Sequence, residues 1–184
     1  TYQDAGAFLQ KTQALLEARE AANSLMLGIC LRLKESPETA QHTPYLATVE
    51  DGQGVAVAAV MTPPQKVVLY SDRPACEEAF ERLAQGLTVG GWAVPGVLGP
   101  SRIAESFAGV WARVSGQRYR AGIRQRIYEL KRVDHPQYSP GRLRVAEEAD
   151  VDLVAEWAFA FQQEALGEGS VEEARQLAER RMKA

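Results

Sequence analysis

The first part of the chain carries hydrophobic residues at helical spacing. One helix is predicted after an N-cap at Asp4 and runs to about Arg19; its apolar stripe is made of Phe8, Leu9, Leu15 and Leu16. A second helix is predicted from Asn23 to just before Pro37, because proline disfavours helical backbone at the residue before it. Apolar residues surround most of this second helix, which predicts that it is buried on more than one side.

Between residues 45 and 71 the spacing changes to that of β-strands. Two strands are predicted at 45–50 and 54–61, joined through Asp51-Gly52, the commonest short hairpin signal. Pro63-Pro64 ends the second strand, and residues 66–71 form a third that is rich in Val, Leu and Tyr. This segment therefore predicts a hairpin extended by a further strand.

Helices and strands alternate in the next part. A helix is predicted with Pro74 in its first turn and with its end before Gly86, and a short buried strand follows at 96–99. Ser101 then caps another helix, and a long strand over 117–131 closes the unit. Early hairpins and late strand–helix–strand crossovers predict an α/β (α+β) fold, in which a mixed, mostly antiparallel sheet has helices on both faces.

A second unit follows a segment that two prolines interrupt. The chain resumes with a predicted strand at 142–146, a helix from Asp150 to about Gln163 and a last helix from Ser170 to Ala184. One strand and two helices are too few to enclose a hydrophobic core of their own. The predicted organisation is a first domain at 1–134, a linker at 135–141 and the start of a second, incomplete domain at 142–184.

The composition of the chain mainly excludes some classes of protein. Hydrophobic residues make up 46% of the chain and charged residues 24%, as in ordinary globular proteins. The 24 acidic residues against 21 Lys and Arg give a net charge of −3, which is not typical of a dedicated nucleic-acid binder. No apolar run is long enough to span a membrane, and early acids such as Asp4 and Glu17 are not typical of a secretory leader. Cys30 and Cys76, both in predicted helices, indicate a reducing compartment, so we expect a cytoplasmic protein without membrane association.

Residues able to carry chemistry are few. The two histidines, His42 and His135, both lie in loops flanked by proline, where a lone histidine is usually a solvated surface residue. The spacings typical of His and Cys metal ligands, of a serine nucleophile elbow and of Gly-rich nucleotide motifs do not occur in the sequence. We therefore expect no bound metal, and the residue types assign no catalytic residue.

One turn combines features of an anion site. Residues 96–102 pass from a predicted strand into a helix N-terminus, where free N–H groups and the helix dipole can hold a phosphate or carboxylate. Gly99, Ser101 and Arg102 are accordingly weak candidates for a cofactor-binding site. The favoured interpretation is structural: the glycines form the turn, and Ser101 caps the helix.

The predicted strand 117–131 has a basic side. Arginines alternate there with apolar and aromatic residues; the arginines are Arg118, Arg120, Arg124 and Arg126. Such a face near tyrosines can bind nucleic acid or a phosphorylated cofactor. More often it is solvated and balanced by acids on neighbouring elements, and the overall acidity of the chain favours this interpretation.

Four strings, taken in their order along the chain, carry a family resemblance. They are residues 19–28 with a Glu-x-x-Asn-x-x-x-x-Gly pattern, Gly96-Val97-Leu98-Gly99-Pro100 followed by Phe107 and Trp111, residues 124–130, and residues 142–146 with Asp150, Leu153 and Trp157. They resemble the GNAT acetyltransferase superfamily, in particular bacterial proteins with two GNAT-like units in tandem. The resemblance covers most of the chain.

The resemblance implies that acetyl-CoA binds where the fourth strand meets the third helix, at a Gly-rich turn whose N–H groups hold the pyrophosphate. The matching place in the first unit is Ser71-Asp72-Arg73-Pro74-Ala75. It contains no glycine, Pro74 lacks an N–H group, and Asp72 would repel a phosphate. The first unit therefore resembles a degenerate GNAT unit, and the matching turn of the second would lie beyond Ala184. We expect no cofactor bound tightly to this chain.

By this resemblance the protein transfers an acetyl group from acetyl-CoA, as co-substrate, to an amine of a small molecule or a peptide. This chain would be its N-terminal, supporting part. The alternative is a non-catalytic binding or interaction module that keeps the fold. A weaker alternative is an RNA-binding or RNA-modifying role that rests on the basic strand. We expect no nucleic-acid partner, and the sequence leaves a homo-oligomer open.

Overall fold

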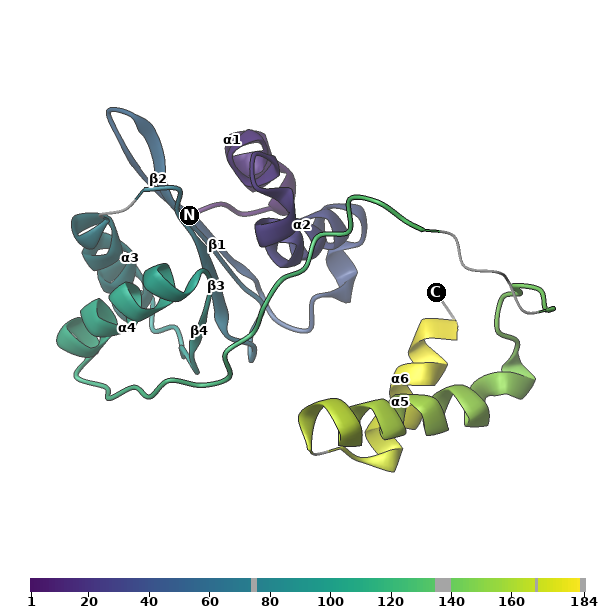
Figure 1. Ribbon diagram of the computed structural model, residues 1–184. Coiled ribbons are helices and arrows are strands. Elements are labelled where there is room, and N and C mark those ends of the chain that lie inside the picture. Colours follow the sequence, from purple (N-terminus) through teal and green to yellow (C-terminus); the bar gives the residue numbers. More distant parts are fainter. Residues whose placement is uncertain (74–75, 135–139, 168, 183–184) are drawn as a thin grey trace. The chain divides into compact units, whose positions relative to one another are not determined.

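The computed structural model describes residues 1–73, 76–134, 140–167 and 169–182. Its contacts divide the chain into two units, Thr1–Lys131 and Arg132–Ala184. The described residues form six α-helices and one four-stranded open sheet, so the fold is of the mixed α+β kind (Figure 1).

A mostly antiparallel sheet forms the centre of the first unit. Its strands are β1 (Tyr45–Asp51), β2 (Gly54–Met61), β3 (Val67–Tyr70) and β4 (Val97–Leu98), in the spatial order β1-β2-β3-β4. The first three are antiparallel neighbours, and β4 pairs with β3 in parallel. The Asp-Gly hairpin is confirmed: Asp51 Oδ1 accepts a hydrogen bond of 2.8 Å from the N–H of Gln53, which closes the turn.

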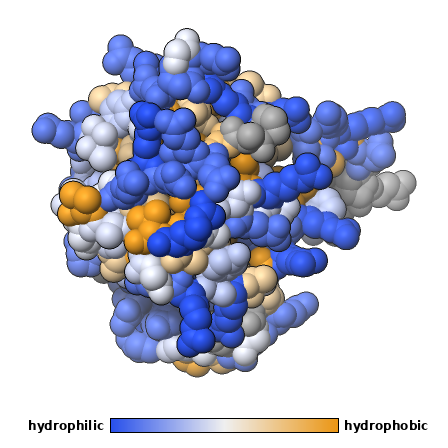
Figure 2. Space-filling view, turned by 90° about the vertical axis from the view of Figure 1, so that its left-hand side faces the viewer, coloured by the Kyte–Doolittle hydropathy of each residue, from blue (hydrophilic) through white to orange (hydrophobic). Residues whose placement is uncertain are grey.

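Helices cover both faces of this sheet, as the order of elements predicted. One face is covered by α1 (Ala5–Glu17) and α2 (Glu20–Glu35), the other by α3 (Glu77–Val89) and α4 (Ser101–Ser115) (Figure 1). The side of the first unit on which α3 and α4 lie is mostly hydrophilic, with hydrophobic residues in separate spots (Figure 2). The apolar sides of these helices are thus turned inward.

Each face of the sheet has its own hydrophobic core. Successive side chains of a strand point to opposite faces, so on β2 Val57 joins the core under α3 and α4, and Ala58 joins the core under α1 and α2. The first core includes an aromatic group in which Phe80 meets Phe107 edge to face and Phe107 stacks on Trp111. Phe107 and Trp111 are both buried in this core.

The helix ends follow local side-chain chemistry. Asp4 caps α1 as predicted, with Oδ1 accepting a hydrogen bond of 2.8 Å from Ala7 N. The buried Asn23 side chain donates to the carbonyl of Leu16 at 3.0 Å and so ties the start of α2 to the end of α1. Gly116 ends α4 in the left-handed region at φ 73°, which glycine adopts without steric cost.

Three details of the predicted helices are wrong. The second helix is exposed at Leu25 and Leu31, because a single layer of helices on a sheet leaves its outer side to solvent. The helix α3 begins at Glu77 and runs through Gly86, since tertiary packing overrides one glycine; Pro74 lies outside the described residues. Ser101 is the first residue of α4 and makes no capping hydrogen bond, because Pro100 occupies the N-cap position.

The predicted strand over 117–131 is also wrong. These residues follow α4 as an open segment without strand pairing, and Tyr119, Ile123 and Ile127 are exposed (Figure 1). Alternation of apolar and polar residues suits a strand, but a strand forms only where another strand supplies partners for its N–H and C=O groups. One anchor at the start of the segment is the hydrogen bond of 3.0 Å from Trp111 Nε1 to Gln117 Oε1.

The second unit is a helical hairpin of α5 (Val151–Leu166) and α6 (Val171–Met182). The predicted strand at 142–146 is wrong for the same reason, because no described strand pairs with it and Leu143 is fully exposed. Two hydrogen bonds of 2.5 and 2.7 Å from Arg144 to Asp150 fix the entry to α5, and they hold the pKa of Asp150 well below its usual range. Small residues, Ala155, Ala174 and Ala178, fill the contact between the helices.

Candidate functional site

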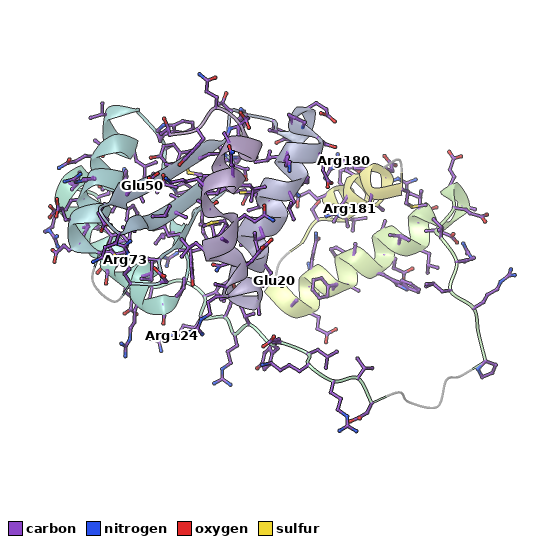
Figure 3. All side chains as sticks on the ribbon, turned by 90° about the horizontal axis from the view of Figure 1, so that it is seen from above. Glu20, Glu50, Arg73, Arg124, Arg180 and Arg181 are labelled. Carbon is purple, nitrogen blue, oxygen red and sulfur yellow. The ribbon has the colours of Figure 1, made fainter. Side chains whose placement is uncertain are left out.

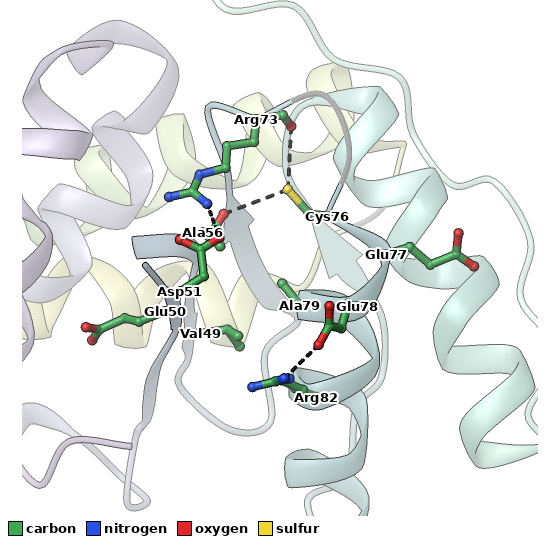
Figure 4. Close-up of a pocket in the computed structure, with 10 residues that line it drawn as sticks. All are labelled: Val49, Glu50, Asp51, Ala56, Arg73, Cys76, Glu77, Glu78, Ala79 and Arg82. Atoms are coloured by element: carbon green, nitrogen blue, oxygen red, sulfur yellow. Dashed lines mark hydrogen bonds and ion pairs between the residues drawn. The ribbon is translucent and has the colours of Figure 1, made fainter. Parts of the chain in front are cut away.

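A hollow of about 320 Å³ lies at the start of α3, beside the hairpin of β1 and β2 (Figure 4). It includes Arg73 from the turn at which the resemblance places a cofactor. The sequence indicated that turn but not the hollow, whose other wall comes from residues 49–51 and Ala56, which precede Arg73 by 17 to 24 positions. The lining residues are Val49, Glu50, Asp51, Ala56, Arg73, Cys76, Glu77, Glu78, Ala79 and Arg82.

Arg73 is held by groups in and beside this hollow. Its guanidinium forms an ion pair with Asp51 (Figure 4). The guanidinium also donates a hydrogen bond of 3.4 Å to the carbonyl of Val55, and the backbone N–H of Arg73 donates to Ser71 Oγ at 3.1 Å. The N–H of Gln53, followed by Arg73, lowers the pKa of the Asp51 carboxyl. The guanidinium of Arg73 is therefore bonded to the hairpin of β1 and β2, and a ligand would have to displace these contacts.

The remaining charges of the hollow are also paired. Glu78 pairs with Arg82 at 2.6 Å along α3. Glu50 and Glu77 point away to either side in Figure 4, toward partners outside the hollow. These partners are Lys11 at 2.8 Å and Arg113 at 2.5 Å.

The balance of charge in the hollow is acidic. Four of its lining side chains are carboxylates and two are guanidinium groups. A phosphate would therefore meet like charge, and would have to displace an existing carboxylate to reach either guanidinium. This balance of charge is unfavourable to a pyrophosphate.

Cys76 lies at the floor of the hollow, directly before α3. Its Sγ lies 3.0 Å from Ser71 Oγ, and it donates weakly toward the carbonyls of Arg73 and Ala56 at 3.6 and 3.9 Å. These contacts join the turn after β3 to β2 and to the start of α3. No pattern in the sequence marks this role of Cys76 beyond its position next to a predicted helix start.

The weak anion-site candidates lie together at the start of α4. Ser101 and Arg102 are exposed, and Gly99 precedes them on the surface. Gly99 is required for packing, because a Cβ there would lie 2.6 Å from the carbonyl oxygen of Leu69 on β3. Gly99 lies near Ser101 and Arg102 simply because the three are close in sequence. The structure therefore explains why position 99 is a glycine, but it adds no further contact for an anion.

The two histidines differ in what the structure describes. His42 is exposed and borders a shallow hollow of about 150 Å³ with Arg32 and Thr62 among its neighbours. No carboxylate lines that hollow to orient the imidazole for acid–base chemistry. His135 lies outside the described residues.

Among the residues that the structure describes, no three His, Cys, Asp or Glu side chains gather as a metal site would require. None of their helices has the length and apolar character needed to cross a bilayer.

Comparisons of the chain with protein-family models, curated proteins and solved structures found no match.

Proposed function

We propose that this chain is the N-terminal, supporting part of a GNAT-like N-acetyltransferase. The observation that carries the proposal is the order of elements in the first unit: two helices, three antiparallel strands, a helix, a parallel strand and a helix. It agrees with the order predicted from the sequence up to α4 and lacks the predicted closing strand over 117–131. The acceptor is an amine of a small molecule or of a peptide.

In this reaction the amine nitrogen attacks the thioester carbonyl of acetyl-CoA. The N–C bond forms, the C–S bond breaks, coenzyme A leaves, and a base takes the amine proton. Holding both substrates in reactive geometry supplies much of the rate, and the base adds the rest. On this proposal the cofactor turn and the base belong to another part of the protein, and the first unit supports or shapes the substrate side.

The charges of the first unit support this division of roles. A pyrophosphate site needs converging N–H donors and little nearby negative charge. The hollow at α3 instead has Arg73 and Arg82 already paired and a majority of carboxylates.

The second unit supports the proposal in a different way. Three large apolar side chains spaced four residues apart on α5 are exposed: Leu153, Trp157 and Phe161. The opening helix of a larger domain would show such a row, because one partner helix cannot cover it.

The test compares the natural protein with the 184-residue chain. We expect the natural protein to release coenzyme A from acetyl-CoA with one member of an amine panel, and we expect calorimetry on the chain to detect no binding at micromolar acetyl-CoA. Micromolar binding by the chain, lost in Arg102→Ala but kept in the surface control Arg32→Ala, would show that the first unit is a working cofactor site.

The alternative is a non-catalytic interaction module with the same fold. The paired charges of the hollow fit it equally well. A natural protein that neither binds acetyl-CoA nor releases coenzyme A would favour the module over the enzyme.

A further inference from the structure

The open segment after α4 concentrates positive charge. Residues 117–131 contain five cationic side chains and one acid, Glu129, in a chain whose net charge is −3. Lys131 pairs with Glu129 at 3.3 Å. The four arginines, Arg118, Arg120, Arg124 and Arg126, form no ion pair with any described residue and are all exposed.

This arrangement differs from a balanced, solvated face. A balanced face would place carboxylates of neighbouring elements against the arginines, and the described carboxylates pair elsewhere or not at all. At ion-pair distance, therefore, no described carboxylate neutralises the four guanidinium groups, and an anionic ligand can pair with them without first displacing one.

Exposed aromatic rings lie among these arginines. Tyr119 is 57% exposed and Tyr128 is 83% exposed. Arg124, which lies between them in the sequence, extends from the same open segment (Figure 3). Cationic side chains that track a phosphate backbone, with aromatic rings on which bases stack, are the two elements of single-strand recognition. Arginine suits this role because its planar fork contacts phosphate oxygens in pairs.

We propose that residues 118–128 form a binding surface for single-stranded nucleic acid. The open segment is neither a helix nor a two-stranded ribbon, the shapes that fill the major groove of a duplex. Anionic membrane surfaces also attract basic segments, and the exposed tyrosine rings, on which bases can stack, favour a single strand over a membrane here. The surface is separate from the proposed acetyl transfer and does not depend on it. It reverses the expectation, based on net charge, that nucleic acid is not a partner.

The test measures fluorescence anisotropy of a labelled oligouridylate of about 12 nucleotides with the 184-residue chain. Four phosphate contacts predict a slope of log K against log salt of about −3 for a single strand. The affinity should then fall roughly 50-fold between 50 and 200 mM NaCl. No binding at 50 mM NaCl would overturn the proposal.

Paired variants separate this surface from general charge. Arg124→Ala with Arg126→Ala should make the slope shallower by about 1.4, whereas the lysine pair at the same positions should keep it. The matched control is Arg180→Ala with Arg181→Ala on α6, which removes the same charge from exposed side chains without described ion pairs (Figure 3). An equal effect of this control would refute a localised surface.

Stacking is tested at Tyr128. Tyr128→Ala should weaken binding at least about fivefold, and Tyr128→Phe should restore it, because the ring and not the hydroxyl stacks. Since the side chain is exposed, the thermal midpoint of both variants should match that of the parent. Equal affinity for a duplex of the same length, or binding to phosphatidylserine vesicles without binding to the oligonucleotide, would assign the segment to another partner.

Discussion

Replacing Trp111 tests whether α4 is packed as the structure has it. The side chain is 8% exposed, and its ring stacks on Phe107 with centroids 6.3 Å apart and an interplanar angle of 24°. A buried aromatic side chain removes about 150–250 Å² from water, worth about 4–6 kcal/mol at 25 cal/mol per Å². Because alanine keeps part of this and the site relaxes, Trp111→Ala should lower the free energy of unfolding by about 3–5 kcal/mol.

Two milder variants separate the contribution of the ring from that of its hydrogen bond. Trp111→Phe keeps an aromatic ring on Phe107 but removes the hydrogen bond to Gln117, so we expect a loss of about 1–2 kcal/mol. Gln117→Ala removes only the acceptor, at an exposed position, and should cost about 0.5–1 kcal/mol. The ranking of the three variants follows from the contacts that each one loses.

The measurement is urea unfolding followed by far-ultraviolet circular dichroism. Trp157→Ala is the matched control, since Trp157 on α5 is 64% exposed and its replacement should change the free energy of unfolding by under about 0.5 kcal/mol. A loss below about 1 kcal/mol for Trp111→Ala, or an equal loss for the control, would refute the packing described for α4.

Two other variants and one titration test the first unit. Gly99→Ala should destabilise the first unit by about 1–3 kcal/mol, because the new Cβ meets the Leu69 carbonyl. Gly28→Ala, which has open space around it in α2, should stabilise the unit by up to about 1 kcal/mol. Thermal unfolding that ranks the two variants the other way would contradict this geometry. Burial raises the pKa of Cys30 from 9.0 to about 12. The folded state thus favours the protonated thiol, so stability is full below about pH 9 and falls as the pH rises toward 12. Cys30→Ala should flatten that decline in urea midpoints measured between pH 8 and 11, and an unchanged decline would assign it to other groups.

Local patterns predicted the parts of the fold that depend on neighbouring residues. The Asp51-Gly52 pair is sufficient for the hairpin, because its turn closes within four residues. Asp4 marks the start of α1 for a similarly local reason, because its side chain caps an N–H three residues away.

Features that depend on distant partners could not be predicted in this way. Residues 117–131 alternate as a strand does, yet pairing depends on a neighbour that the alternation does not specify. The hollow at α3 depends on Arg73 meeting Asp51 across 22 positions, and no motif marks that pair. The net charge of the chain also hides local charge, because it sums the arginines after α4 with acids elsewhere in the sequence. It therefore argued against a nucleic-acid partner without regard to where the arginines lie.

The two edges of the sheet bear on aggregation. An open strand edge is a template for pairing with another chain, and proteins guard against this by shortening or covering such strands. Here β4 is two residues long, so it offers an incoming strand very few backbone groups. At the opposite edge the N–H of Tyr2 already occupies the carbonyl of Leu46 on β1 at 2.8 Å. The alanine- and valine-rich strand β2 lies inside the sheet. It is separated from one edge by β3 and β4, and from the other edge by β1, one of whose carbonyls is already bonded.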